Sequence, residues 1–275
     1  MNPAGRLALA AVLCSLANAG GVRSGQWQPQ TLHDFECYVQ SAEARMDSRQ
    51  PFLLADANPA LNAQVVHGKI QTIAPNGANP HKITGGQLYD WVGTVFIPGA
   101  TLERLIRMLQ DYDHRARYFP DVIAASKLLC RRGENQFRFT MRLKEPAVID
   151  TEDEVVWEQV DPHRWRCRSY STNVQEVGKD HGYLRQLYSY WRVAEVEKGV
   201  YVEGQTITVS DAFGSLTRAI GSMMGINPEK SLKRSLESMR DSVLKPGAEF
   251  PAPASGLPEC GEPFRPGNCA SKPAQ

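Results

Sequence analysis

Long apolar runs are scarce in this chain of 275 residues. The longest lies near the start, where residues 7–16 supply about ten apolar or small positions. A helix that crosses a bilayer needs about 20 such residues. The sequence therefore predicts no membrane-spanning helix.

An excess of charge of either sign is also absent. The chain has 31 Lys and Arg residues and 30 Asp and Glu residues. Proteins that bind nucleic acid through their surface carry a basic excess or a basic patch, so the balance argues against a nucleic-acid partner. Transient contact with a membrane is left open.

Motifs that mark metal sites and common enzymes are missing. Cys-x-x-Cys pairs and His-x-x-x-His spacings, which bind zinc, do not occur. The nucleophile motif Gly-x-Ser-x-Gly is absent, and Gly85-Gly86 predicts a turn, not a loop that holds a nucleotide. We therefore expect no metal and no cofactor.

The start of the chain has the pattern of a secretory signal peptide. Arg6 precedes the apolar stretch, and Ala17-Asn18-Ala19 supplies the small residues of a cleavage site. We expect cleavage near Ala19 and an exported protein, periplasmic or secreted, with residues 1–19 removed. A buried N-terminal helix is the alternative.

Cysteines beyond this segment are few, and an oxidising compartment would allow them to pair. They are Cys37, Cys130, Cys167, Cys260 and Cys269. Cys260 and Cys269 are close together in a tail rich in proline and glycine, residues 245–275. We expect these two to form a disulfide and the rest of the tail to be disordered.

Residues 20–88 predict an N-terminal extension. Within it, residues 30–47 place apolar side chains at intervals of three and four, which is typical of an amphipathic helix. Residues 65–73 alternate like a strand. The sequence leaves open whether this extension covers a cavity or extends a sheet.

Later segments alternate between strand and helix patterns. Residues 136–144 alternate apolar and polar side chains, as in a strand with one buried face. Residues 155–157, 165–171 and 187–193 alternate similarly, and residues 200–210 place small side chains on one face, where a helix could approach closely. Residues 216–244 then predict a long helix, interrupted at Gly225 and restarted at Asn227-Pro228.

Residues 92–130 carry a resemblance to a known family. A strand-like run ends at Pro98, Thr101 can cap a helix, and a second short helix and a strand follow. This order, with the spacing from Asp111-Tyr112 to Tyr118-Phe119-Pro120, resembles the START-like superfamily, also called helix-grip or polyketide cyclase/dehydrase (SRPBCC) proteins. Coenzyme-Q-binding proteins and lipid-binding START domains belong to it.

The resemblance covers residues 89–244 and implies an α+β helix-grip fold. In that fold a curved antiparallel sheet wraps around a long C-terminal helix, here with an N-terminal helical extension. It also implies that Cys130 and Cys167 lie on strands separated by two others, too far apart to pair, so we expect two buried thiols. An unrelated α+β domain is the alternative.

Such a fold can enclose an apolar cavity between the sheet and the helix. We expect its hydroxyls mainly to satisfy the protein's own polar groups, although they could orient a polar group of the ligand. Side chains that simply fill the core are the alternative to a cavity. The expected cavity residues are Phe139, Met141, Trp157, Ser169, Ser189, Trp191, Thr206, Met223, Met224 and Met239.

The function implied by the resemblance is binding or transport of a hydrophobic small molecule (a lipid, a quinone or a polyketide-like compound) by an exported monomer, without catalysis. One alternative is a cyclase, aromatase or dehydratase, for which Asp113 and His181 are weak catalytic candidates. Asp111 is expected to be a turn or cap residue. A third class, an envelope interaction protein, predicts an exposed apolar patch near Phe35 and Val39.

Overall fold

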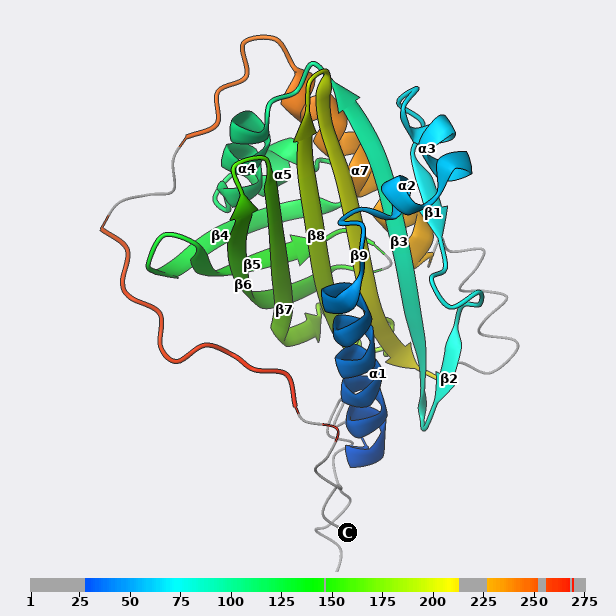
Figure 1. Ribbon diagram of the computed structural model, residues 1–275. Coiled ribbons are helices and arrows are strands. Elements are labelled where there is room, and N and C mark those ends of the chain that lie inside the picture. Colours follow the sequence, from blue (N-terminus) through cyan, green and yellow to red (C-terminus); the bar gives the residue numbers. More distant parts are fainter. Residues whose placement is uncertain (1–27, 146, 213–226, 252–255, 268, 270–275) are drawn as a thin grey trace, which may run out of the picture.

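The computed structural model of the chain is an α+β structure built on one antiparallel sheet (Figure 1). It describes residues 28–145, 147–212, 227–251, 256–267 and 269, so the predicted signal peptide lies outside the described residues. Its strands are β1 (Gln71–Ile73), β2 (His81–Ile83), β3 (Gly86–Pro98), β4 (Ile123–Arg132), β5 (Gln136–Leu143), β6 (Ile149–Asp161), β7 (Arg164–Glu176), β8 (Gln186–Val196) and β9 (Gly199–Asp211). Its helices are α1 (Pro29–Ser48), α2 (Leu54–Ala57), α3 (Pro59–Val65), α4 (Leu102–Gln110), α5 (Arg115–Tyr118) and α7 (Pro228–Leu244). None of these helices combines the length and apolar character needed to cross a membrane.

The sheet runs in the order β1-β3-β9-β8-β7-β6-β5-β4, and β2 pairs with another part of β3. Its longest pairing joins β3 and β9, from Gly86 opposite Asp211 to Pro98 opposite Gly199. The sheet curves, with α7 against one face and α1 against the other (Figure 1). The predicted α+β helix-grip fold is therefore confirmed.

Helix α7 begins where the sequence predicts a restart. The Asn227 side chain accepts a hydrogen bond from the Lys230 amide at 3.2 Å, and Pro228 occupies the first turn, where its missing N–H costs nothing. The helix buries an apolar face consisting of Leu232, Leu236, Met239 and Val243. The earlier half of the predicted helix, residues 216–226, lies outside the described residues.

Two facing glycines shape the contact between α7 and the sheet. Gly93 on β3 is paired with Gly204 on β9. A Cβ atom on Gly93 would lie 2.6 Å from Leu236 Cδ1, so α7 packs directly on the β3 backbone there. Gly204 instead makes room for the Trp191 indole. The sequence predicts that a helix approaches the strand of residues 200–210 closely. In the structure α7 makes its close approach at Gly93 on the neighbouring strand, β3.

A methyl group at position 93 should disturb this contact. We expect Gly93→Ala to lower the free energy of unfolding by about 1–3 kcal/mol, because overpacking a closed interface forces buried side chains to move. Chemical denaturation would measure the loss. Gly261→Ala is the matched control, because nothing lies within 4 Å of the added Cβ and its effect should stay below about 0.5 kcal/mol. Equal stability of the two variants would contradict the close approach.

Helix α1 covers the face of the sheet opposite α7. Its Phe35, Val39 and Ala42 are buried against the tyrosines and aliphatic residues of that face, which confirms the predicted amphipathic helix. Phe35 and Val39 are 0% exposed, so the apolar patch expected of an interaction protein is wrong. Strands β1 and β2 extend the sheet beside β3, and residues 28–88 of the extension do not line the cavity described below.

Residues 65–73 do not form the single strand that their alternation predicts. Helix α3 ends at Val65, and only Gln71–Ile73 pair as β1. A cap explains the helix: the Asn58 side chain accepts from the Leu61 amide at 3.1 Å, and Pro59 follows it. Leu61 and Val65, four residues apart, then share one buried side.

The C-terminal tail is attached to the domain at several points. Disulfides join Cys130 to Cys260 and Cys37 to Cys269, so the predicted Cys260–Cys269 pair is wrong, as is the free thiol predicted at Cys130. Cys167 is free and buried, as expected. Figure 1 shows residues 245–251 leaving the end of α7 and residues 256–267 running beside the sheet toward α1.

Side-chain contacts add to these attachments. Phe250 is 7% exposed and packs edge-on against Tyr118, and Phe264 packs beside Tyr170. A segment rich in proline and glycine cannot form a core of its own, but here its few apolar residues join the core of the domain. The predicted disorder of the tail is therefore wrong for residues 245–251 and 256–267.

Candidate ligand-binding site

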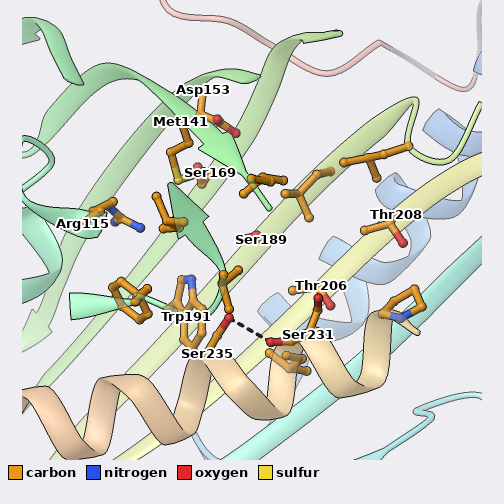
Figure 2. Close-up of a pocket in the computed structure, with 18 of the residues that line it drawn as sticks. Arg115, Met141, Asp153, Ser169, Ser189, Trp191, Thr206, Thr208, Ser231 and Ser235 are labelled. Atoms are coloured by element: carbon orange, nitrogen blue, oxygen red, sulfur yellow. Dashed lines mark hydrogen bonds between the residues drawn. The ribbon is translucent and has the colours of Figure 1, made fainter. Parts of the chain in front are cut away.

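A cavity of about 180 Å³ lies between the inner face of the sheet and α7 (Figure 2). Its walls come mainly from β5–β9 and α7, with one side closed by α4 and α5. The structure therefore favours a cavity over a completely filled core. The predicted residues that line it are Phe139, Met141, Trp157, Ser169, Ser189, Trp191, Thr206 and Met239. Met223 and Met224 lie outside the described residues.

The size of the cavity limits what it can enclose. An engineered cavity of about 150 Å³ in another protein holds one benzene molecule, and pockets for drug-sized ligands have volumes of about 300–1,000 Å³. A single ring or a short chain therefore fits inside the described walls. A larger ligand would have to extend beyond them or move them apart.

Aromatic side chains brace one wall of the cavity. Trp157 Nε1 donates a hydrogen bond to the Tyr112 hydroxyl at 2.8 Å, and the Tyr112 ring stacks on Phe139 at 4.3 Å between centroids. Tyr112 belongs to the Asp111-Tyr112 element of the sequence motif. The other residue of this element, Asp111, accepts a hydrogen bond from the Tyr118 hydroxyl, and its carboxylate lies 2.9 Å from His114 Nδ1. The motif therefore joins the end of α4 to α5.

Four hydroxyls face the cavity without a hydrogen-bond partner among the described residues: those of Ser169, Ser189, Thr206 and Thr208. The expectation that the inward-facing hydroxyls satisfy the protein's own polar groups is therefore wrong for these four. Ser171, on the same strand as Ser169, does have such a partner, because its hydroxyl lies 2.7 Å from the Gln186 side chain. The four free hydroxyls can bind water or a ligand.

A buried carboxyl also lines the cavity. Asp153 on β6 is 2% exposed and accepts a hydrogen bond from the Thr151 hydroxyl at 2.6 Å. Burial raises the pKa of Asp153 to about 7, although the Thr151 hydrogen bond and the charge of Arg115 both act to lower it. Asp153 therefore populates both its protonated and its ionised form at neutral pH.

Sequence reasoning missed Asp153, although a signal was present. Residues 149–154 carry four acidic side chains, a pattern that predicts a solvent-facing strand. Extending the inward alternation of Trp157 and Val155 by two residues, however, places Asp153 on the inner face. The structure shows this alternation for all three residues.

Arg115 supplies the positive charge on the wall. Its guanidinium lies over the Tyr112 ring, 4.6 Å from the centroid, and one terminal nitrogen donates to the Leu109 carbonyl at 2.9 Å. Its Nε is buried and has no hydrogen-bond partner in the described part of the chain. Figure 2 shows the Arg115 side chain at the cavity wall, where it can offer a donor to a bound molecule.

The two catalytic candidates named from the sequence lie elsewhere. Asp113 contacts Lys127 Nζ at 2.9 Å and accepts from the Leu128 amide at 3.1 Å. His181 contacts Glu176 at 3.2 Å and stacks on Tyr183. Neither candidate lines the cavity, so these side chains hold turns in place and are wrong as candidates for chemistry inside it.

Cys167 lines the cavity as a thiol. Burial raises its pKa to about 12, so the thiolate is scarce near neutral pH. Because the thiolate is the nucleophilic form of cysteine, the environment of Cys167 argues against a nucleophilic role.

Comparison with known proteins finds similar solved structures at low sequence identity. No protein-family model and no curated protein matches the sequence. Solved structures match as follows. A STAR-related lipid transfer protein from Xanthomonas axonopodis has 14% identity and a TM-score of 0.46, covering 61% of this chain and 98% of its own. Human STARD10 has 12% identity and a TM-score of 0.42, and the match covers 80% of this chain and 83% of STARD10. The Zhui aromatase/cyclase from Streptomyces sp. R1128 has 11% identity and a TM-score of 0.44, and the match covers 57% of this chain and 93% of the aromatase/cyclase. With such identities and TM-scores below 0.5, these matches name no ligand and no reaction for this chain.

Proposed function

We propose that this protein binds a small hydrophobic molecule in the cavity between its sheet and α7, and carries it. The observation on which this depends is the space of about 180 Å³ that remains after α7 has packed on the sheet. Apolar side chains such as Phe139, Val155 and Trp191 supply most of the walls, and their contact with a ligand removes apolar surface from water. The few polar groups can orient the bound molecule.

We further propose that the protein works after export, as a monomer. Disulfides persist in oxidising compartments, and the two that tie Cys37 and Cys130 to the tail fit such a location. The signal-peptide pattern before Ala19 supports the same proposal. A carrier in the periplasm or outside the cell would shield an apolar molecule from water between two membranes or proteins.

A variant with a filled cavity tests the binding function. We expect Ser189→Phe to place a ring inside the cavity and to weaken ligand binding by at least about tenfold, since the ring takes the space of the ligand. Native mass spectrometry of the exported protein should detect a bound small molecule in the native protein and a reduced fraction in the variant. Thermal unfolding would verify that the variant is folded.

Thr140→Phe is the matched control. Thr140 lies on β5 between the inward-facing Phe139 and Met141, so its side chain points to the opposite face of the sheet. This variant should bind as the native protein does. A native protein without any bound molecule, and without a shift in melting temperature on addition of extracted lipids, would contradict the proposal.

A second candidate function is acid–base catalysis on a ligand held in the same cavity. Asp153 favours it, because a carboxyl with a pKa of about 7 can give or take a proton at neutral pH. A reaction would require Asp153, whereas binding alone would not. Conversion of a bound compound by the native protein and its loss in Asp153→Asn, with binding retained, would support catalysis over transport.

A further inference from the structure

A row of hydroxyls crosses the sheet wall of the cavity. Ser169 on β7 is paired with Ser189 on β8, and Ser189 is paired with Thr206 on β9. Paired residues on antiparallel strands project to the same face with Cβ atoms about 5 Å apart. The hydroxyl row, Ser169–Ser189–Thr206, therefore has regular steps of this size, and Figure 2 shows the three residues on neighbouring strands.

The hydroxyl row ends beside the buried carboxyl. Asp153 on β6 is paired with Ser171, two residues from Ser169 on the same strand. Asp153 and Ser169 are thus diagonal neighbours on one face, a separation that polar side chains can bridge through a shared ligand atom. Polar groups from four successive strands consequently form one continuous band on a mainly apolar wall.

The row is not used by the protein itself. None of its three hydroxyls has a hydrogen-bond partner within the residues that the structure describes, and the α7 serines opposite do not supply one. Ser235 donates to the carbonyl of Ser231 at 3.0 Å, within its own helix. A wholly apolar ligand would exclude water from the row and lose affinity, about fivefold or more for each hydroxyl left unpaired.

We propose that the hydroxyl row binds an oxygen-bearing edge of the ligand, whose oxygens are about 5 Å apart, as in a 1,3-dioxygenated ring. This inference rests on the proposed binding function and specifies its ligand class. A single ring suits the volume of the cavity, and the aromatic and methionine walls suit a flat molecule. A short chain attached to the ring would extend beyond the described walls or move them apart. Hydroxyls donate to carbonyl oxygens and accept from phenols, so both kinds of oxygen qualify.

Ligands with one carbon skeleton and different oxygens test this inference. The probes are pentylbenzene, 3-pentylphenol and 5-pentylresorcinol, and their binding can be followed by quenching of the fluorescence of Trp157 and Trp191. We expect the native protein to gain about threefold to tenfold in affinity with each added hydroxyl. The isomer 4-pentylcatechol, with adjacent oxygens, should bind more weakly than 5-pentylresorcinol.

Removing the hydroxyls should remove the preference. In the double variant Ser189→Ala and Thr206→Val, 5-pentylresorcinol should lose most of its advantage over pentylbenzene, whose own affinity is retained or increased. Ser235→Ala is the control, because its hydroxyl is already bonded within α7, and it should leave the preference unchanged. If the double variant does not fold, the single variant Thr206→Val, which keeps the side-chain shape, takes its place.

The outcomes separate this inference from the proposed function. Equal affinities of the native protein for pentylbenzene and 5-pentylresorcinol, or an unchanged preference in the double variant, would overturn the inference and leave hydrophobic binding intact. A native protein that binds none of the probes would overturn both.

Discussion

Replacing Asp153 with asparagine is expected to raise the free energy of unfolding at pH 8 by about 2–4 kcal/mol. The reason is the buried position of this carboxyl, which raises its pKa to about 7 in the folded protein, whereas the unfolded chain has a value of about 3.9. Folding at pH 8 therefore requires a buried negative charge. Asparagine has a similar shape and no charge, and it can still accept the Thr151 hydrogen bond.

The sign of the pH dependence follows from the direction of this shift. A carboxyl whose folded pKa is raised costs no stability below its unfolded pKa, because it is protonated in both states. The cost grows between about pH 4 and pH 7 and is complete above that range. The advantage of Asp153→Asn should therefore be full at pH 8 and vanish near pH 4, as measured by urea denaturation of both proteins across this range.

Asp113→Asn is a control with the opposite sign. Burial acts to raise the pKa of Asp113, but hydrogen bonds from Lys127 and the Leu128 amide outweigh it and lower the value. Asp113 therefore stabilises the fold above its unfolded pKa, and this contribution is lost as the pH falls. The control variant should be slightly less stable than the native protein at pH 8. A neutral effect of Asp153→Asn at pH 8 would mean that water in the cavity hydrates the carboxylate.

Local patterns were sufficient to predict most elements of the domain. Thr101 accepts from the Arg104 amide and starts α4 as predicted, and the alternation around Phe139 places β5 with its apolar side inward. Periodicity and capping depend on residues a few positions apart, which a sequence displays directly. The inner faces of the strands followed from the same rule, and with them the cavity residues that lie in the described part of the chain.

Features that depend on distant contacts could not be predicted in this way. Spacing favoured Cys269 as the partner of Cys260, yet the Arg131 amide donates to the Pro258 carbonyl at 3.1 Å and places the tail beside β4. Whether the Ser189 hydroxyl has a hydrogen-bond partner likewise depends on which polar groups α7 presents across the cavity. Asp153 was obscured by neighbouring acids that do face outward, such as Asp150, which pairs with Arg142 at 2.7 Å.

Removing the Cys130–Cys260 disulfide should destabilise the protein strongly. The bridge spans 130 positions of the sequence, and a crosslink restricts the unfolded chain more strongly when it closes a long loop than when it closes a short one. We expect the double variant Cys130→Ala and Cys260→Ala to lose about 3–5 kcal/mol in free energy of unfolding. Denaturant unfolding without a reducing agent would measure it, with Cys167→Ala as a control that removes a buried cysteine but no bridge.

The bridge lies among hydrogen bonds that join the tail to β4. Arg132 donates to the Cys260 carbonyl at 2.9 Å, and Cys260 itself is 5% exposed, so the disulfide lies where the tail joins the sheet. A reducing agent should destabilise the native protein more than the double variant, which retains only the Cys37–Cys269 bridge. Digestion without reduction should yield a peptide linking Cys130 to Cys260. A peptide linking Cys260 to Cys269 would instead show that the tail closes on itself and leaves β4 uncovered.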